Sequence, residues 1–286
     1  MAAQGLELRP VRPSDRPRVE EMTADIWEGH DYLPHVFDEW VRDPNAWFTA
    51  AELDGQLVGL QRLKPIGPGI LWLEGLRVAT THRRRGIAKA LLEAAVEQSR
   101  GLAFQEIRLA TANPDAAALF RKSGYRSLVE VDLWRARRLE GDEPARMPPP
   151  EEAARIWPLV SRDPALAAYG GVDADGGSAL DISAGYLAEL ARKGQLRVAA
   201  GGRSVASVHT GWGGDRKWVG FISGSGAGLH DLLLALRFEA DIDGMEGVNL
   251  WAPGDHPGLE DFNATGYDSA SEPFRMYYFA LALQPV

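Results

Sequence analysis

The chain carries one succession of glycine turns twice, and this recurrence restricts its fold more than any single motif. A predicted turn at Gly55 is followed 147 residues later by a second one at Gly202. The Gly-Tyr pairs that begin at Gly124 and Gly266, each after a short predicted helix, are 142 residues apart. A nearly constant offset is typical of a repeated structural unit. We therefore predict two α/β domains of one kind, related by tandem duplication; the alternative is two unrelated α/β domains that share a Gly-Tyr-x-Ser by chance.

The first half has a clear secondary-structure pattern. Asp54-Gly55 lies between two β-like runs, and both residue types tolerate the positive φ angles of a tight hairpin. A basic, glycine-containing loop later separates a strand from a helix. The expected elements are a strand at 6–9, a helix at 18–27, two strands within 47–63, a strand at 70–78, a helix at 87–99, a strand at 107–111, a helix at 114–123 and a strand at 127–134.

A charged, proline-rich segment follows this pattern at 139–150. Successive prolines favour an extended chain over helix or sheet interior, so we place the domain limits at 1–140 and 151–286, with a linker at 141–150. A length of 286 residues also favours two hydrophobic cores over one. The elements expected after the linker are a helix at 151–160, a hairpin around 201–202, a strand at 218–223, a helix at 229–240 and a strand at 248–251.

The composition argues against several classes of function. A formal net charge of −9 provides no overall positive field for nucleic acid. The absence of cysteine excludes disulfides, thiolate catalysis and thiolate zinc sites. The sequence begins without a basic, apolar leader and has no apolar run long enough to span a bilayer. We therefore expect a cytoplasmic protein, a monomer or a homodimer, with no membrane or nucleic-acid partner and no metal.

The segment Arg83-Arg84-Arg85-Gly86-Ile87-Ala88 follows a predicted strand and opens a predicted helix. Backbone N–H groups at a helix N-terminus converge on an anion where the helix dipole is positive. Small residues at Gly86 and Ala88 allow the backbone to approach phosphate oxygens closely, and the arginines add permanent positive charge. These features predict a pyrophosphate site, with a solvated basic turn as the alternative.

This segment resembles motif A of the GNAT acetyltransferases, R/Q-x-x-G-x-G/A, and residues 113–125 resemble motif B, in which Asn, Ala and a Gly-aromatic pair recur. The resemblance covers about residues 6–136 and implies tandem GNAT-like domains, each a mixed, mostly antiparallel central sheet flanked by helices. It implies acetyl-CoA as the co-substrate, with its pantetheine arm between two splayed strands. The residues that the resemblance places at acetyl-CoA are Leu76, Arg77, Val78, Arg83, Arg84, Arg85, Gly86, Ile87, Ala88, Lys89, Asn113 and Phe120.

At the proton donor this sequence departs from the pattern of the family. Many relatives carry a Tyr at the motif B position held here by Phe120, and that Tyr protonates the leaving thiolate. Phe has no proton to give, so Tyr125 is a weak substitute candidate for the general acid. The alternatives are water, another hydroxyl, or a thiolate that leaves unassisted, since its pKa near 8.5 makes it a tolerable leaving group.

Glu74 is the candidate general base, because acyl transfer to an amine needs a neutral nitrogen. Strand alternation predicts that Glu74 shares a sheet face with Trp72, Leu76 and Val78, near the acetyl group. The alternative is an exposed strand carboxylate that pairs with Arg77 or another cation.

A second resemblance concerns the acceptor. Residues 29–34 with Trp40, and residues 74–78, are similar to segments of the histidine N-acetyltransferase group within the GNAT family. This implies that Glu28, Asp31 and Tyr32 line a pocket that receives an amino group or a cationic ring. The alternative is that Asp31 caps a turn and that Tyr32 and Trp40 are core aromatics.

The second half lacks the arginines of motif A. Its Gly-rich run at 224–228 is either a remnant or a live anion site. This degenerate half is expected to contribute to the acceptor cleft. Four of its side chains are candidates to face that cleft, and the alternative is that they pack in the core. They are His209, Trp212, Trp218 and Trp251.

These patterns together predict an acetyl-CoA-dependent N-acetyltransferase that acts directly, without an acyl-enzyme, on the amino group of a small molecule such as histidine or another amine. There is no Cys nucleophile and no Ser with a visible His/Asp partner pattern. The alternatives are a non-catalytic acyl-CoA-binding sensor and a protein N-acetyltransferase.

Overall fold

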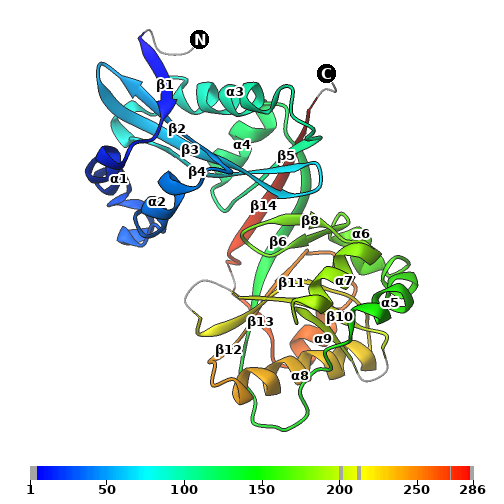
Figure 1. Cartoon of the computed structure of the whole chain (residues 1–286). Coiled ribbons are helices and arrows are strands. Elements are labelled where there is room, and N and C mark those ends of the chain that lie inside the picture. Colours follow the sequence, from blue (N-terminus) through cyan, green and yellow to red (C-terminus); the bar gives the residue numbers. More distant parts are fainter. Residues whose placement is uncertain (1–4, 200–201, 211–213, 271, 284–286) are drawn as a thin grey trace. The chain divides into compact units, whose positions relative to one another are not determined.

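The computed structural model describes residues 5–199, 202–210, 214–270 and 272–283 (Figure 1). The chain forms two compact units, and neither is continuous in sequence. The first unit comprises residues 1–109, 119–126 and 280–286, and the second comprises residues 110–118 and 127–279. Within the described residues, each helix is too short or too polar to cross a membrane.

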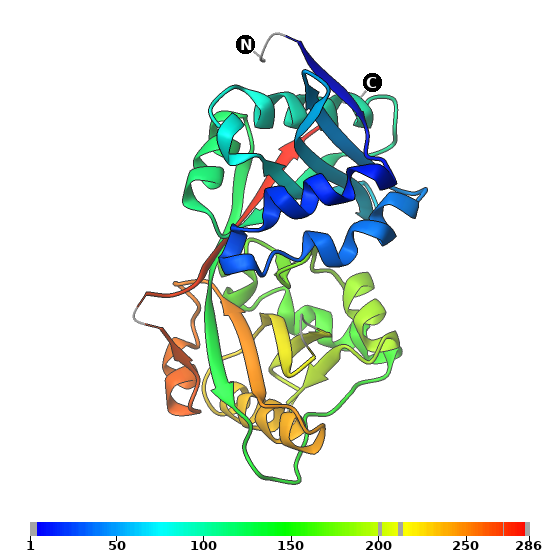
Figure 2. The ribbon, with the colours of Figure 1, turned by 90° about the vertical axis from the view of Figure 1, so that its left-hand side faces the viewer.

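The first unit is a sheet in the order β1-β2-β3-β4-β5, with helices on both faces (Figures 1 and 2). Its strands are antiparallel neighbours except β4 and β5, which are parallel and joined by α3. The elements are β1 (Leu6–Pro10), α1 (Arg16–Thr23), α2 (Leu33–Arg42), β2 (Trp47–Leu53), β3 (Gln56–Gly67), β4 (Ile70–Val78), α3 (Ile87–Ser99) and β5 (Glu106–Thr111), followed by α4 (Pro114–Lys122), part of which belongs to this unit.

Two apolar clusters hold these layers together. One, which includes Phe37 and Trp40 of α2, packs against Leu60 of β3 on one face of the sheet. The other packs Ile87 and Leu91 of α3 on the opposite face. The predicted hairpin is confirmed, because Asp54 and Gly55 have φ values of 53° and 76° and Leu53 pairs with Gln56.

The second unit is a sheet in the order β14-β6-β12-β11-β10-β9, with a separate two-stranded β7-β8 hairpin. The helix α8 joins the parallel strands β11 and β12, as α3 joins β4 and β5. The elements are β6 (Arg126–Arg137), α5 (Ala153–Val160), α6 (Pro164–Ala168), β7 (Val172–Ala174), β8 (Ala179–Asp181), α7 (Ala184–Arg192), β9 (Leu196–Val198), β10 (Val205–Thr210), β11 (Arg216–Ile222), α8 (Ala227–Ile242), β12 (Gly247–Ala252), α9 (Leu259–Ala264), β13 (Asp268–Ser269) and β14 (Arg275–Ala282).

The two halves share local geometry at corresponding positions. Gly75 on β4 and Gly220 on β11 each lie at a β-bulge, and they are 145 residues apart. After α4, the amide of Tyr125 donates to Phe120 O at 3.1 Å, and after α9 the amide of Tyr267 donates to Phe262 O at 2.9 Å. Both turns pass through a glycine of positive φ, the usual way to close a helix C-terminus. The fold thus repeats, whereas its origin by duplication stays a prediction.

The sequence patterns predicted some elements and missed others. The predicted strand at 70–78 and helix at 87–99 are confirmed at both ends. The helix expected at 18–27 is wrong in its limits, because α1 ends at Thr23 and a short 3-10 turn follows at Ile26–Gly29. The helices and strands missed altogether are α2, α6, α7, β7, β8, β13 and β14.

The proline-rich segment forms no helix or strand at 139–149, apart from one β-bridge between Arg146 and Val198. The predicted limits 1–140 and 151–286 stay a prediction about the organisation of the chain. In space, β6 packs within the second unit, antiparallel to β12, while residues 280–286 belong to the first unit. Gly201, in the predicted second hairpin, lies outside the described residues, but β9 and β10 on either side pair antiparallel.

Candidate functional site

The basic loop lies between the end of β4 and the start of α3. Gly86 is the N-cap of α3 with a left-handed φ of 81°, and its carbonyl accepts the first helical bond from Ala90 N at 3.0 Å. Arg84 also has a positive φ, 63°, and the side chains of Arg83, Arg84, Arg85 and Lys89 are exposed. The first amides of a helix have no intrahelical acceptor. The loop therefore presents N–H groups and exposed cations at one helix end, as an anion site requires.

The position of this helix end depends on a close approach between α3 and β3. Ile87 and Leu91 are buried in the core. A Cβ on Gly59 would lie 2.9 Å from Ile87 Cγ2 and 3.1 Å from the Arg77 carbonyl oxygen. Glycine at this position allows the helix to pack directly on the sheet beside the end of β4.

The bulge at Gly75 gives β4 two different environments. Leu76 and Val78 pack toward α3 with Ile87. β4 pairs with β5 only over Ile70–Trp72, although β4 continues to Val78. Among the described residues, the backbone of β4 beyond Trp72 is therefore not paired with β5. The predicted splay of the two strands requires such a separation.

Glu74 does not share a face with Leu76 and Val78, so that prediction was wrong. Arg62 and Leu60 of β3, which lie on one face, pair with Glu74 and Arg77 of β4. The extra residue at the bulge shifts the alternation by one, so Glu74 and Arg77 lie together on the face away from α3.

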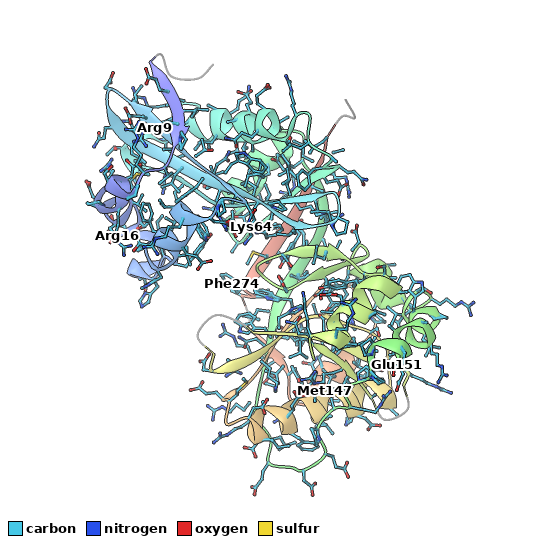
Figure 3. The ribbon with its side chains drawn as sticks, viewed as in Figure 1. Arg9, Arg16, Lys64, Met147, Glu151 and Phe274 are labelled. Atoms are coloured by element: carbon cyan, nitrogen blue, oxygen red, sulfur yellow. The ribbon has the colours of Figure 1, made fainter. Side chains whose placement is uncertain are left out.

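Glu74 is held by cations on one oxygen only. Oε1 accepts from Arg62, which also pairs with Asp43 and stacks 4.8 Å from the Trp40 ring. The Nζ of Lys64, labelled in Figure 3, lies 3.1 Å from the same Oε1. Oε2 has no hydrogen-bond partner among the described residues, and the side chain is 14% exposed. The alternative of a Glu paired with a cation is correct for Oε1, while Oε2 remains able to accept a proton or a hydrogen bond.

Asp31 and Tyr32 surround Arg77 rather than an open pocket. Asp31 is 2% exposed and accepts from Arg77 Nε at 2.7 Å and from Leu33 N at 3.0 Å. The Arg77 guanidinium lies 5.5 Å from the Tyr32 ring centre. Burial raises the pKa of Tyr32 to about 12, although Arg77 opposes this rise. These contacts fit the alternative in which Asp31 caps a turn, and Glu28 lies nearby in sequence as an exposed residue of positive φ, 57°.

The motif B residues are built into local structure. Asn113 Oδ1 accepts from Asp115 N at 2.8 Å and thereby caps α4. Phe120 is buried and packs 5.7 Å from the Tyr125 ring. The Tyr125 hydroxyl is buried without a hydrogen-bond partner in the part of the chain that the structure describes, beside a depression of ≈ 90 Å³ next to Lys89. Burial raises the pKa of Tyr125, so proton transfer from this phenol to a thiolate is uphill.

The Gly-rich run of the second half is already occupied by a side chain. The amide of Gly226 donates to Asp261 Oδ2 of α9 at 2.9 Å. A carboxylate at this place repels phosphate, and no arginine lies in the run. The geometry favours a remnant over a live anion site.

His209 lies in a buried polar cluster of the second unit. Asp173, whose side chain is 1% exposed, accepts from His209 Nε2 at 3.0 Å, Ser207 Oγ at 2.9 Å and Tyr186 OH at 2.8 Å. Trp218 and Trp251 lie within the same unit, and Trp212 lies outside the described residues. Burial lowers the pKa of His209, but the Asp173 carboxylate outweighs this and raises it to about 9.

The stability of the protein should therefore fall with alkaline pH. Folded His209 keeps its proton up to about pH 9, whereas the unfolded side chain loses it near pH 6.5. The His209 contribution is complete below the unfolded pKa and is lost as pH rises toward 9, by roughly 3 kcal/mol. Urea denaturation of wild type across this range should show the fall. His209→Gln should flatten it and His35→Gln, an exposed histidine, should keep it; an unchanged slope in His209→Gln would contradict the assignment.

Comparison with known proteins agrees with the basic loop and its flanking elements. The family model described as "Acetyltransferase (GNAT) family" matches residues 15–125. The histidine N-acetyltransferase of Oreochromis niloticus is 32% identical over 98 residues, which cover 34% of this chain and 29% of that protein. The probable N-acetyltransferase 16 of Homo sapiens is 35% identical over 90 residues, which cover 31% of this chain and 24% of that protein. The chain thus spans less than a third of the length of these relatives.

Solved structures resemble the chain over almost its whole length. A GCN5-related N-acetyltransferase from Sphaerobacter thermophilus has a TM-score of 0.64 at 15% identity, covering 100% of this chain and 98% of that one. One from Kribbella flavida has a TM-score of 0.51 at 15% identity, covering 96% of this chain and 70% of that one. At such identities the likeness concerns the fold alone. It confirms the predicted architecture of two GNAT-like halves.

Proposed function

Residues 15–125 of this chain belong to the GNAT acetyltransferase family, and from this premise we propose that the protein transfers the acetyl group of acetyl-CoA to the amino group of a small molecule. The observation that carries the proposal is the N-terminus of α3 at Gly86, which presents helix-start amides and exposed arginines beside the part of β4 that, among the described residues, extends beyond its pairing with β5. A pyrophosphate suits the first feature. The pantetheine arm suits the second, because its amides can bond strand edges.

The proposed reaction has one proton transfer before the acyl transfer. The amine gives a proton to Glu74 Oε2, directly or through water, and its neutral nitrogen attacks the thioester carbonyl. A backbone N–H of β4 at or near Leu76 stabilises the oxyanion. The carbon–sulfur bond then breaks and CoA leaves as a thiolate, and the nitrogen gives its second proton to water, which leaves the neutral amide. Water protonates that thiolate or it leaves unassisted, because Phe120 has no proton and the buried Tyr125 is a poor donor.

The surroundings of Glu74 and the names of the relatives bear on the chemical class of the acceptor. Glu74 Oε2, which has no hydrogen-bond partner among the described residues, can accept from one amino group, and the Glu74 side chain is 14% exposed. The names of the relatives, three of which are histidine N-acetyltransferases, favour an amino acid over a protein substrate. A thiol-release assay with acetyl-CoA and amino acids, polyamines and aminoglycosides tests this. Cofactor binding without thiol release on any acceptor would favour the alternative of a non-catalytic acyl-CoA sensor. That alternative is suggested by Phe120, which stands where many family members carry the proton-donating Tyr.

The glycine at the start of α3 provides a sharper test of the anion site. Gly86→Val adds a side chain where the phosphate would approach, and it strains a left-handed φ. We expect the Kd for acetyl-CoA to rise about 10- to 100-fold, the value of one lost charge-assisted hydrogen bond. Gly101, just after the other end of α3, has a φ of 74° and open space around it. Gly101→Val is the matched control, and an equal loss of affinity in both variants would mean that strain alone is responsible.

A further inference from the structure

The polar cluster around Asp173 lies on the face of the second sheet that is turned away from α8. Ala206 and Val208 of β10 belong to the apolar cluster beneath α8, so Ser207 and His209 point to the opposite side. Gly220 lies at the second bulge, at the position that corresponds to Gly75 in the first half. A Cβ on Gly220 would overlap the Asp173 carboxylate, so the Asp173 face corresponds to the Glu74 face of the first half. The second half therefore has its own polar cluster at the equivalent place.

Asp175 adds a second negative charge beside Asp173, and the single positive charge of His209 cannot balance both carboxylates. Its Oδ1 accepts from Gly177 N at 2.8 Å and its Oδ2 from Ser178 Oγ at 3.0 Å. His209 Nδ1 lies 3.8 Å from Oδ2, too far for a hydrogen bond, and is the nearest cationic group paired with Asp175 in the described part of the chain. The side chain is 18% exposed. Burial raises the pKa of Asp175, as expected for a carboxylate that lacks a full counter-charge.

Two neighbouring indoles have buried N–H groups, and one of them adjoins the turn that carries Asp175. Trp218 of β11 and Trp251 of β12 have ring centres 5.8 Å apart, and neither Nε1 has a hydrogen-bond acceptor among the described residues. Trp251 is 2% exposed, and a Cβ on Gly176 would lie 3.3 Å from its Nε1, so this N–H adjoins the turn that carries Asp175. Buried donors in native proteins are nearly always satisfied.

The turn and its aromatic wall are held in place. The amide of Gly176 donates to Tyr278 OH at 2.7 Å. Phe274, labelled in Figure 3 and 48% exposed, lies 5.9 Å from the Trp251 ring. Phe274 and Trp251 together form an apolar surface next to the turn that carries Asp175.

We propose that this cluster is a binding site for an amino acid zwitterion, whose ammonium pairs with Asp175 and whose carboxylate accepts from the indole N–H groups of Trp251 and Trp218. The carboxylate without a full counter-charge attracts a cation, and the two N–H donors need an acceptor, which a carboxylate can provide. A ligand with both charges on neighbouring atoms meets both needs at once, whereas an amine or a carboxylic acid meets one. The site lies wholly within the second unit and uses none of the residues assigned to acetyl transfer.

The test is calorimetric titration of the full chain with glycine, L-alanine and L-histidine, without acetyl-CoA, against methylamine and acetate. We expect the zwitterions to bind at least about tenfold more tightly than either half-molecule. Asp175→Asn and Trp251→Phe should each weaken binding by about tenfold, because each removes one charged contact or donor. Asp181→Asn, an exposed carboxylate on the same β7-β8 hairpin, should leave binding unchanged.

Two further variants separate this site from the acetyl-transfer site. Glu74→Gln should keep zwitterion binding even where it abolishes thiol release. Binding that is lost in Glu74→Gln and kept in Asp175→Asn would overturn the proposal, as would acetate or methylamine binding as tightly as glycine. If Asp175→Asn lowers the melting temperature, Trp218→Phe, which keeps a six-membered aromatic ring and removes the N–H together with the pyrrole ring, decides the outcome. Zwitterion binding without any acetyl transfer would refute the proposed function and leave this inference intact.

Discussion

Glu74→Gln is expected to lower kcat for thiol release by about 10²- to 10⁴-fold, the usual contribution of a positioned general base. The amide keeps an oxygen for Arg62 and Lys64, which both contact Oε1 in the wild type. It replaces Oε2, which has no partner among the described residues, with a group that cannot take a proton. The variant should therefore fold and bind acetyl-CoA as the wild type does. Steady-state kinetics with the best acceptor, together with a Kd for acetyl-CoA, provide the measurement.

Glu52→Gln is the matched control for this variant. Glu52 is also a strand carboxylate of the first unit in an ion pair, with Arg9 Nε 2.6 Å from Oε2, and its side chain is 22% exposed. Its substitution should leave kcat unchanged. A Glu74→Gln enzyme with the kcat of the wild type would show that another group, or water alone, deprotonates the amine.

Asp31→Ala is expected to destabilise the fold by about 3–5 kcal/mol, because it leaves the buried Arg77 guanidinium without its counter-charge. The Arg77 side chain is 16% exposed and the Asp31 side chain 1%, and two nitrogens of Arg77 contact both carboxylate oxygens. The same change removes the acceptor of Leu33 N at the start of α2. The free energy of unfolding in urea, by circular dichroism, measures the loss.

Asp38→Ala is the control for a surface ion pair. Asp38 lies 2.9 Å from Arg16 Nη1 and its side chain is 55% exposed, so its loss should leave the free energy of unfolding nearly unchanged. Asp31→Asn should fall between the two, because it keeps an acceptor for Leu33 N but not the charge. If Asp31→Ala unfolds at the same urea concentration as Asp38→Ala, the buried pair does not stabilise α2 against β4.

The partner of Asp31 in this ion pair could not be predicted from the local sequence. A carboxylate and a Tyr in a loop before a helix resemble a ligand pocket, and only the fold brings Arg77, 46 positions later in the sequence, against them. The helix α2 that follows was missed, although Leu33, Phe37 and Trp40 are buried at helical spacing and Pro34 suits a helix start. That signal was available in the sequence.

Local chemistry is what the sequence by itself determined. The Asp54-Gly55 turn, the limits of β4 and α3, and the glycine at the start of α3 follow from φ preferences, apolar periodicity and capping, which act within a few residues. The anion-binding character of the basic loop follows from the same short stretch.

Only the tertiary structure decided which side chains meet. The bulge at Gly75 reverses the face of Glu74 because one extra residue shifts a period of two, and its presence depends on how β3 and β4 pair. The placement of β6 with β12, and of residues 280–286 with the first unit, depends on pairing between strands far apart in the chain. The cluster of Asp173, Asp175, His209 and the two indoles joins residues from four strands and their turns, which no local pattern encodes, because packing of distant segments is set by the whole core.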